Sequence, residues 1–458
     1  MSTTCICICA GPPSTGACSA LRLIIGTPCR NWSGFSGSLE EMMSDFVYAE
    51  TDPAELAEYR EQVETWMNEN MPRRDRVNPW HPTHDDDLKS TRNRELQRRL
   101  SDGGYAAVCY PREYGGQSLT IAHQRIIDDV SMDFDMPILF SVPTLSICGP
   151  TILEFGTEEQ KQRYIPAWIR GDELWVQFMS EPSGGSDMAG ALTRADRDGD
   201  AFVINGSKIW STFAQRSDYA LMLARTNWEV PKHRGLTMFI VPIHYPGIDI
   251  HPIRMVDGTE EFCQEYFNDV IIPAENVVGE VDDGWTVASR LLFHERASVG
   301  NASPYTQGRH RSRSADGLDD LATIARDFGG NVGRQRQRLG ETETLSRVEV
   351  LLSDRVVKGI ESGYFPAPAG SLVRLFHGLS RADRLTVAME LHGDRALVWN
   401  QGEDTGGYGV EYVQRQQTCI GGGTTEMARN IISERILGMP REPAADRDLP
   451  FNQVPRSG

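Results

Sequence analysis

A single glutamate stands on the apolar face of a predicted helix in the second half of the chain. Residues 285–299 follow a helical period, and Glu295 lies four residues after Leu291 and seven after Ala288, so its carboxylate shares their face. Loss of hydration raises the pKa of a carboxyl group and makes it a stronger base toward the weakly acidic proton beside a carbonyl. The pattern fits a general base, and it also fits a salt-bridged glutamate at the edge of that face.

A glycine-containing loop at residues 180–187 follows a strand-like run and reads Ser-Glu-Pro-Ser-Gly-Gly-Ser-Asp. Paired glycines let backbone N–H groups approach a ligand closely, and the Ser and Asp side chains add hydrogen bonds. The loop can therefore hold a phosphate or a polar ring. A glycine-rich surface turn is the alternative interpretation.

A third segment, residues 421–426, places three glycines and two threonines before Glu426 at the start of a predicted helix. The threonine is typical of a helix cap, and the glycines leave bare backbone beside which a ligand or another chain could pass. Taken alone, the segment is only a helix N-terminus.

The elements that would position these residues change type twice along the chain. Helical spacing is predicted at 54–71, 88–100, 121–134 and 157–170, with breaks that include Pro150. Strand-like runs follow at 174–180, 201–204, 207–212, 219–225, 236–242 and 265–272. Asn205-Gly206 predicts a type I′ hairpin between two of these runs. Helical patterns return at 285–299, 346–361, 381–400 and 425–437. Several short antiparallel strands between helical regions favour a central barrel or sandwich.

Length and composition limit the possible classes of protein. The 458 residues, 40% of them hydrophobic, can bury a large core in two or three domains. A net charge of −18 repels polyphosphate backbones and argues against nucleic acid as a partner. No apolar run approaches the roughly 20 residues of a membrane helix, so no membrane span is predicted. The cysteines beyond residue 29 are scattered singly, which predicts a reduced, cytoplasmic protein.

The first 41 residues are predicted to be a disordered extension, or to reflect a start placed too early, with the folded chain opening at Met42 or Met43. Residues 1–39 contain no acidic residue and lack the basic start and long apolar centre of a secretory signal. Their Cys-x-Cys-x-Cys run has no His or further Cys cluster to complete a ligand set. No metal site is therefore predicted.

These segments, in this order, resemble the acyl-CoA dehydrogenase family over residues 53–442. The likeness is carried by five motifs, at residues 110–116, 156–164, 180–187, 205–210 and 422–426. It implies an α+β multidomain fold of three domains and a tail: an N-terminal α-helical domain at 50–172, a central β-barrel at 173–283, a C-terminal four-helix bundle at 284–442 and the tail at 443–458. It also implies a homotetramer or homodimer.

The resemblance assigns residues to an FAD cofactor and an acyl-CoA substrate. In the family, the residue matched by Ser180 bonds the isoalloxazine edge, and those matched by Trp210 and Thr212 stack on the flavin ring and approach its N5. The implied cofactor contacts are Gln177, Phe178, Met179, Ser180, Gly185, Ser186, Trp210, Ser211, Thr212, Thr424 and Glu426. The implied substrate contacts are Ser186, Arg296, Gly422 and Gly423.

The family reaction removes a proton from the acyl α-carbon while the β-hydrogen leaves as hydride to FAD, and the electrons then pass to an electron-transfer flavoprotein. Many members carry the base at the position matched by Gly422, which has no side chain here. Isovaleryl-CoA dehydrogenase and its relatives instead use a Glu followed by Arg on the first helix after the barrel, which Glu295-Arg296 matches. The resemblance and the helix-face argument thus identify the same catalytic base, Glu295.

Two segments of the expected bundle depart from the family. The family motifs Arg-x-x-Phe-Gly and Gln-x-x-Gly-Gly, which hold the FAD adenosine across a subunit interface, correspond to residues 309–313 and 390–394, where Glu390 replaces the Gln. These departures leave open a non-catalytic or half-site subunit of a hetero-oligomer with a paralogue. An oxygen-using flavin oxidase or monooxygenase on the same fold is a further alternative, although Glu295 argues against the monooxygenase, which needs no α-proton base.

Overall fold

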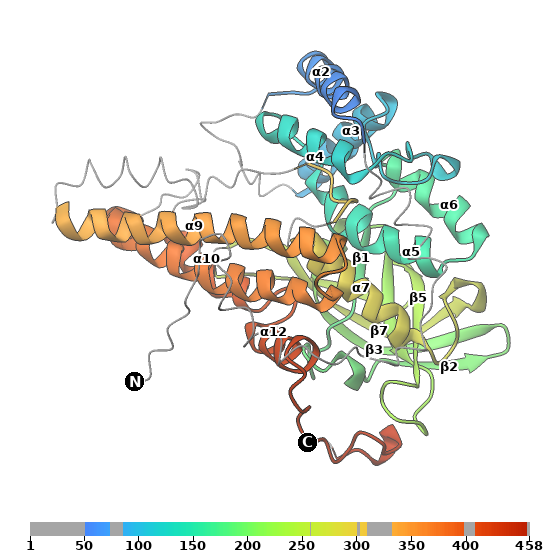
Figure 1. Ribbon diagram of the computed structural model, residues 1–458. Helices are drawn as coiled ribbons and strands as arrows, with labels where there is room; N and C mark the ends of the chain where they lie inside the picture. Colours follow the sequence, from blue (N-terminus) through green and yellow to red (C-terminus); the bar gives the residue numbers. More distant parts are fainter. Residues whose placement is uncertain are drawn as a thin grey trace. The chain divides into compact units, whose positions relative to one another are not determined.

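The computed structural model describes residues 51–73, 86–256, 258–299, 303–308, 332–397 and 408–455. The predictions for the extension at 1–41 and for the arginine-rich segment at 309–313 lie outside these ranges. The described elements run in the predicted order, with helices first, then strands, then helices (Figure 1).

Helices build the N-terminal part of the chain, and local signals set their ends. The Asp52 carboxylate accepts a hydrogen bond from Ala54 N at the start of the first helix, whose inner face buries Val63 and Met67. The break predicted at Pro150 is wrong, because this proline lies in the first turn of a helix, where its missing N–H costs nothing. These helices are α2 (Pro53–Asn70), α3 (Asp86–Asp102), α4 (Ile121–Val130), α5 (Gly149–Phe155) and α6 (Glu158–Ile169).

Among the described residues, eight strands form one sheet, in the order β6-β7-β3-β2-β4-β5-β8, with β1 paired to β4. The expected antiparallel pairing holds for most neighbours, but β1 and β2 both run parallel to β4. Alternating side chains from the strands bury one continuous hydrophobic core. The strands are β1 (Trp175–Phe178), β2 (Arg194–Asp198), β3 (Ala201–Thr212), β4 (Tyr219–Arg225), β5 (Leu236–Pro242), β6 (Ile248–Ile253), β7 (Phe262–Pro273) and β8 (Val277–Val278).

The hairpin predicted at Asn205-Gly206 is wrong, because β3 runs straight through this dipeptide. The β3–β7 register shifts at Gly206, whose φ is +148°, so the pair forms a β-bulge. The Asn205 side chain bonds Asp269 of β7 at 2.9 and 3.0 Å instead of turning the chain. The actual hairpin joins β2 to β3 through residues 199–200. The charged sequence of β2 carries no apolar alternation that could have revealed it.

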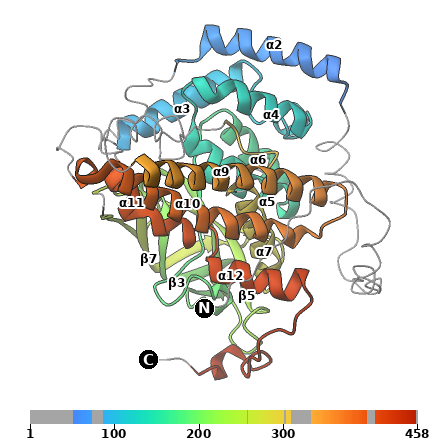
Figure 2. The same cartoon turned by 60° about the vertical axis from the view of Figure 1, so that its left-hand side comes forward.

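Long helices form the C-terminal part. In Figures 1 and 2, α9 and α10 lie side by side, and Glu349 of α9 accepts hydrogen bonds from Arg384 Nη2 at 2.8 Å and Ser380 Oγ at 3.1 Å of α10. The helix predicted at 381–400 is displaced: it begins at Gly370 and ends at His392, before Gly393 with its φ of +58°. The helices are α7 (Gly284–Val299), α9 (Val332–Glu361), α10 (Gly370–His392), α11 (Tyr408–Gln414) and α12 (Thr425–Ile431).

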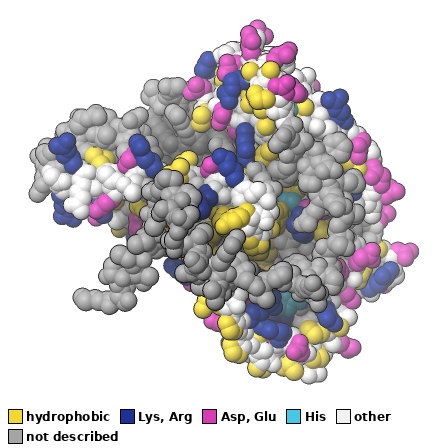
Figure 3. Space-filling model, viewed as in Figure 1, with side chains coloured by type: hydrophobic (Ala, Val, Ile, Leu, Met, Phe, Trp, Pro, Cys, Tyr) yellow, Lys and Arg dark blue, Asp and Glu magenta, His cyan; other side chains and the backbone are white. Residues whose placement is uncertain are grey.

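Acidic and basic side chains are interspersed over the face drawn in Figure 3. The net charge of −18 is therefore not gathered into one acidic patch on that face. No helix among the described residues is both long and apolar enough to cross a membrane.

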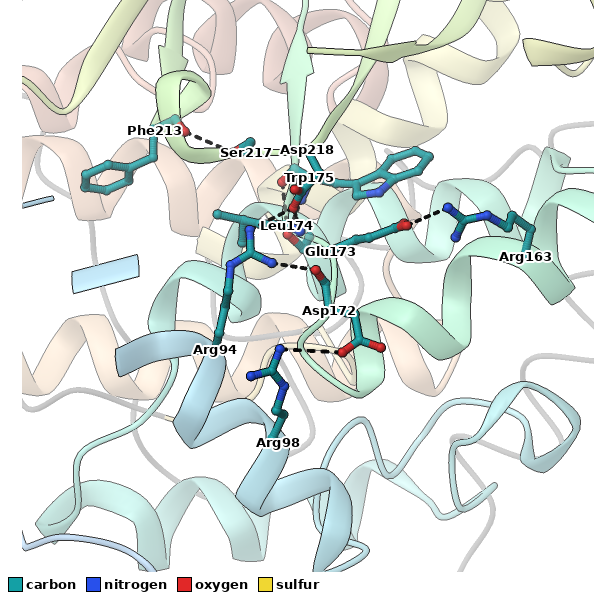
Figure 4. A network of polar contacts seen from close by, with 11 residues as sticks. Arg94, Arg98, Arg163, Asp172, Glu173, Leu174, Trp175, Phe213, Ser217 and Asp218 are labelled. Atoms are coloured by element: carbon teal, nitrogen blue, oxygen red, sulfur yellow. Dashed lines mark hydrogen bonds and ion pairs between the residues drawn. The ribbon is translucent and has the colours of Figure 1, made fainter. Parts of the chain in front are cut away.

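A polar network fixes the start of β1 against the N-terminal helices (Figure 4). The Asp218 carboxylate accepts hydrogen bonds from Leu174 N at 2.7 Å and from Arg94 of α3 at 2.8 Å. Arg163 of α6 pairs with Glu173 at 2.6 Å. The residues that lead into β1 are thus held from two helices and from the residue that precedes β4.

We expect Asp218→Ala to lower the free energy of unfolding by about 1–3 kcal/mol, because it removes the acceptor of Leu174 N and of Arg94 Nη2. Urea titration followed by circular dichroism measures this difference. The matched control is Asp249→Ala, which removes an exposed carboxylate from β6 and should change stability by no more than about 0.5 kcal/mol. Equal effects from both variants would contradict the role given to the network.

Candidate active site

The carboxylate of Glu295 lies on the inner side of α7 and meets β1. Leu291 and Ala288 on the same face are fully buried, and Glu295 itself is half-buried. Its Oε2 accepts a hydrogen bond from Gln177 Nε2 at 3.3 Å. Burial raises the pKa of Glu295, while the bond from Gln177 and the charges of Arg296 and Arg374 oppose the shift. The structure thus brings two predicted site residues, Glu295 and Gln177, into contact.

An ion pair fixes α7 against α5 close to Glu295. On α7 it involves Arg290, five residues before Glu295, and His294, directly before it. Glu154 of α5 accepts two hydrogen bonds from the Arg290 guanidinium, both at 2.7 Å, and one from His294 Nε2 at 2.9 Å. Burial opposes ionisation of Glu154, but the bonds from Arg290 and His294 outweigh it and lower its pKa to about 2. The bidentate geometry sets both the rotation and the axial position of α7.

The irregular helical segment Phe140–Cys148 supports β1 from the side away from β4. Thr144 Oγ1 accepts from Trp175 N and donates to Trp175 O, both at 2.9 Å, as a neighbouring strand would. Cys148 Sγ donates to Val176 O at 3.5 Å. This segment was missed in the sequence because an internal proline, Pro143, interrupts any helical period.

The loop at 180–187 is hydrogen-bonded to β3 at its start and exposed to solvent at its tip. Ile209 N donates to Ser180 O at 3.0 Å, and buried Lys208 donates to Met179 O at 3.1 Å. Gly185 and Ser186 are exposed. The loop therefore offers an exposed backbone and an exposed hydroxyl at its tip, while its start is held against β3.

Trp210 stands on a second bulge of β3. The β3–β7 register shifts between Ile209 and Ser211, and Trp210 takes a φ of +69°, which is rare for a large side chain. About half of its surface (53%) is exposed, and its ring meets Phe262 edge-on with a centroid distance of 6.0 Å. Ser211 beside it is buried and Thr212 is half-buried. The bulge presents a large aromatic face outside the core.

The glycine segment before α12 has a left-handed backbone at Gly422 (φ +72°) and Gly423 (φ +91°). Thr424 caps α12 through a hydrogen bond from Met427 N at 3.1 Å. Glu426 is exposed. In the described part of the chain, neither Thr424 nor Trp210 is hydrogen-bonded to Glu295.

Arg374 of α10 is a site residue that sequence reasoning missed. It is only 4% exposed and donates to Gly421 O, so it anchors the glycine segment. Its Nε and Nη1 have no hydrogen-bond partner among the described residues, and its charge acts on Glu295. No periodic or motif signal marks this arginine, because it is one of several in a mixed helical sequence.

The N-terminal, middle and C-terminal domain models of acyl-CoA dehydrogenases match residues 53–172, 177–270 and 282–437. The chain therefore belongs to the acyl-CoA dehydrogenase family. This result confirms the predicted family and fold class.

Among curated relatives, the chain is similar to the acyl-CoA dehydrogenase IpdE1 of Mycobacterium tuberculosis, with 32% identity over 85% of this chain and 99% of that protein. It is also 32% identical to the acyl-CoA dehydrogenase FadE34 of the same organism, over 75% of this chain but only 46% of FadE34. The chain thus spans about half the length of FadE34. Among solved structures, the Tcur3481-Tcur3483 steroid ACAD matches with a TM-score of 0.69 and 28% identity, over 86% of this chain and 99% of that chain.

We expect Glu154→Gln to lower stability at neutral pH by about 3 kcal/mol, the value of a pKa held near 2 instead of 4.5. The folded state prefers the ionised carboxylate. Its contribution is therefore complete above pH 4.5 and is lost as the pH falls toward 2. Urea titrations at pH 7, 4.5, 3 and 2 should show the difference between the two proteins shrinking over this window. A difference that stays constant from pH 7 to 2 would contradict the ion pair.

Proposed function

We propose that the chain catalyses the FAD-dependent α,β-dehydrogenation of an acyl-CoA thioester to the trans-2-enoyl-CoA, with Glu295 as the base that removes the α-proton. The observation that carries the proposal is the Glu295 carboxylate, whose pKa burial raises, in contact with Gln177 of β1 on a helix that Glu154 locks in place. Membership of the acyl-CoA dehydrogenase family supports it.

The α-proton of a thioester is a weak acid, so its removal needs a base stronger than an ordinary carboxylate and a donor for the developing enolate oxygen. The raised pKa of Glu295 answers the first need. The nearby charges of Arg296 and Arg374 oppose the rise in its pKa and so favour the ionised carboxylate. The backbone N–H of Gly422 is the donor that we assign to the thioester carbonyl.

The residues present fit an FAD cofactor. Gln177 Oε1 is buried and has no hydrogen-bond partner among the described residues, so it suits a donor on the edge of the flavin ring. Trp210 offers its exposed face for stacking, and the open loop tip at Gly185 and Ser186 suits the pyrophosphate. Bound FAD would supply the two-electron acceptor for the hydride from the β-carbon. An electron-transfer flavoprotein is the partner that we propose for the next step.

A bulky acyl group, branched or ring-bearing, is the substrate class that we propose. Three consecutive glycines at 421–423 contribute no side chains to the expected acyl pocket. A steroid ACAD is among the similar solved structures. Dye reduction with short, branched, long and ring-bearing acyl-CoA esters compares these classes directly.

We expect Glu295→Gln to retain FAD but to lose acyl-CoA-dependent flavin bleaching by about 10³-fold, the range lost with a general base. The amide keeps the shape and the contact with Gln177 but cannot accept the proton. Stopped-flow absorbance under anaerobic conditions measures the rate. Glu61→Gln, an exposed change on α2, is the control and should bleach at the wild-type rate.

Undiminished bleaching by Glu295→Gln would overturn the assignment of the base. Oxygen uptake in step with substrate consumption, in air and without an added electron acceptor, would instead favour the alternative function of an oxygen-using flavin oxidase.

A second candidate is a half-site subunit of a hetero-oligomer with a paralogue. Glu390, at the position of the family glutamine, pairs with Arg338 of the same chain at 3.0 and 3.3 Å. Each side chain is thereby engaged by the other rather than left free for a cofactor from a neighbouring subunit. The paired name of the Tcur3481-Tcur3483 steroid ACAD also favours this candidate.

If the Arg338–Glu390 pair limits cofactor binding, Glu390→Gln should raise the FAD content per chain, because the amide removes this ion pair and restores the family residue, while Arg338 keeps its bond to Glu341. The ratio of flavin to protein absorbance in the purified full chain measures this content. Glu61→Gln again serves as the control. One FAD per chain in the wild-type protein, with no gain in the variant, would rule out the half-site interpretation.

A further inference from the structure

A carboxylic acid lies in the core of the sheet, beneath the bulge that carries Trp210. Glu265 of β7 has no exposed surface. Its strand partners are Lys208 on β3 and Ile250 on β6. Ser211 Oγ donates to Glu265 Oε2 at 3.2 Å, and Glu265 Oε1 has no hydrogen-bond partner among the described residues. A glutamate in such a position is costly unless it is neutral or paired.

The nearest cation is already engaged by another carboxylate. Lys208 Nζ donates to Glu181 Oε1 at 2.9 Å, and both side chains are almost fully buried. Burial alone would raise the pKa of Glu181, but Lys208 and the N–H groups of Leu192 and Thr193 hold it below its usual value. Glu181 is therefore the counterion of Lys208. Among the described residues, Glu265 has no counterion within ion-pair distance.

Burial raises the pKa of Glu265 to about 8, against smaller opposing effects from Ser211 and Lys208. The core therefore favours a protonated Glu265 at neutral pH. The titratable or charged groups that face this part of the core are Lys208 of β3, Glu181 after β1, Arg225 of β4 and Cys263 of β7.

The contact with Ser211 connects Glu265 to the surface. Ser211 directly follows Trp210, the residue that leaves the β3–β7 ladder with a positive φ. Such a bulge is strained and persists only where its surroundings hold it. The hydrogen bond from Ser211 into the core is one such restraint. The Lys208 bond to Met179 O restrains the base of the 180–187 loop in the same way.

We propose that Glu265, while neutral, is a positioning residue that leaves Lys208 bound to Glu181 and Met179 O, and that its ionisation loosens the cofactor face formed by the bulge and the 180–187 loop. An ionised Glu265 competes with Glu181 and Met179 O for Lys208, so it disturbs the restraint on the base of the loop. The bond from Ser211 persists in both forms, since a carboxylate accepts it at least as well as a neutral acid. This inference rests on the proposed binding of FAD at that face.

The first test measures FAD affinity of the full chain from pH 6.5 to 9.5 by the quenching of flavin fluorescence. We expect the wild-type Kd to rise by about tenfold per pH unit above pH 8, because the tighter-binding form carries one more proton. Glu265→Gln, which keeps a neutral side chain of the same shape, should match the wild type at pH 7 and remain flat to pH 9.5. Glu260→Gln, an exposed neighbour, should follow the wild type.

The second test needs no FAD, so it separates this inference from the proposed function. The folded-state pKa of Glu265 is raised, so folding takes up a proton between pH 4.5 and 8 and stability falls as the pH rises through that range. The unfolding constant of the wild type, relative to Glu265→Gln, should therefore increase by about tenfold per pH unit there. Infrared spectra of the wild type at pH 7 should also contain a protonated carboxyl band that disappears at pH 9.5.

A wild-type Kd that does not change up to pH 9.5 would overturn the proposal, as would the same alkaline loss in Glu265→Gln, which would identify Lys208 as the titrating group. Should Glu265→Gln fail to fold, the wild-type Kd profile and the infrared spectra still test whether Glu265 is neutral at pH 7 and whether FAD affinity falls at alkaline pH. Absence of the carboxyl band at pH 7 refutes a neutral Glu265. Failure to bind FAD at any pH, with the stability and infrared results as expected, would count against the proposed function alone.

Discussion

The candidate site depends on keeping a short strand and a helix within hydrogen-bonding distance of each other. Gln177 lies on β1, Glu295 lies on α7, and 118 positions of sequence separate them. Neither element is held by local sequence alone. β1 has only four residues, and it relies on β4, Thr144 and the Asp218 network for its position. α7 relies on the Glu154 ion pair.

These restraints share one physical character, since each is a charged or polar group, buried or half-buried, whose loss would be costly. Asp218 bridges two elements at the entrance to β1, and Glu154 bridges two helices beside the proposed base. Lys208 bridges the loop and β3. Hydrophobic packing makes the core, but it tolerates small shifts. Directional bonds to single atoms set the positions on which proton transfer depends.

Hydrophobic period predicted several elements well, because burial of one face decides where a helix or strand can form, but it misplaced the start of α9 and both ends of α10. It located α2, α6, α7, β4 and β5 to within a residue or two, and it identified the face that carries Glu295. It failed where tertiary contacts override local preference. Asn205-Gly206 became a bulge because β7 offers Asp269 as a partner, and the charged strand β2 forms only because β3 pairs with it. Thr144, Arg374 and Glu265 act through partners far along the chain, which no local pattern encodes.

The glycine segment before α12 has a consequence for how this protein can change. If α7 carries the base, as proposed, the loop at 421–423 has no proton to move, and the residues at these three positions can change with the shape of the acyl group. The backbone conformation restricts substitution more strongly at some of these positions than at others. Gly422 and Gly423 need left-handed conformations, whereas Gly421 does not, and a Cβ built on Gly421 meets only Gln417 O at an ordinary 3.7 Å. Gly421 is thus the position in this loop where evolution or design can most readily add volume, and so narrow the range of substrates, without changing the proposed base, Glu295.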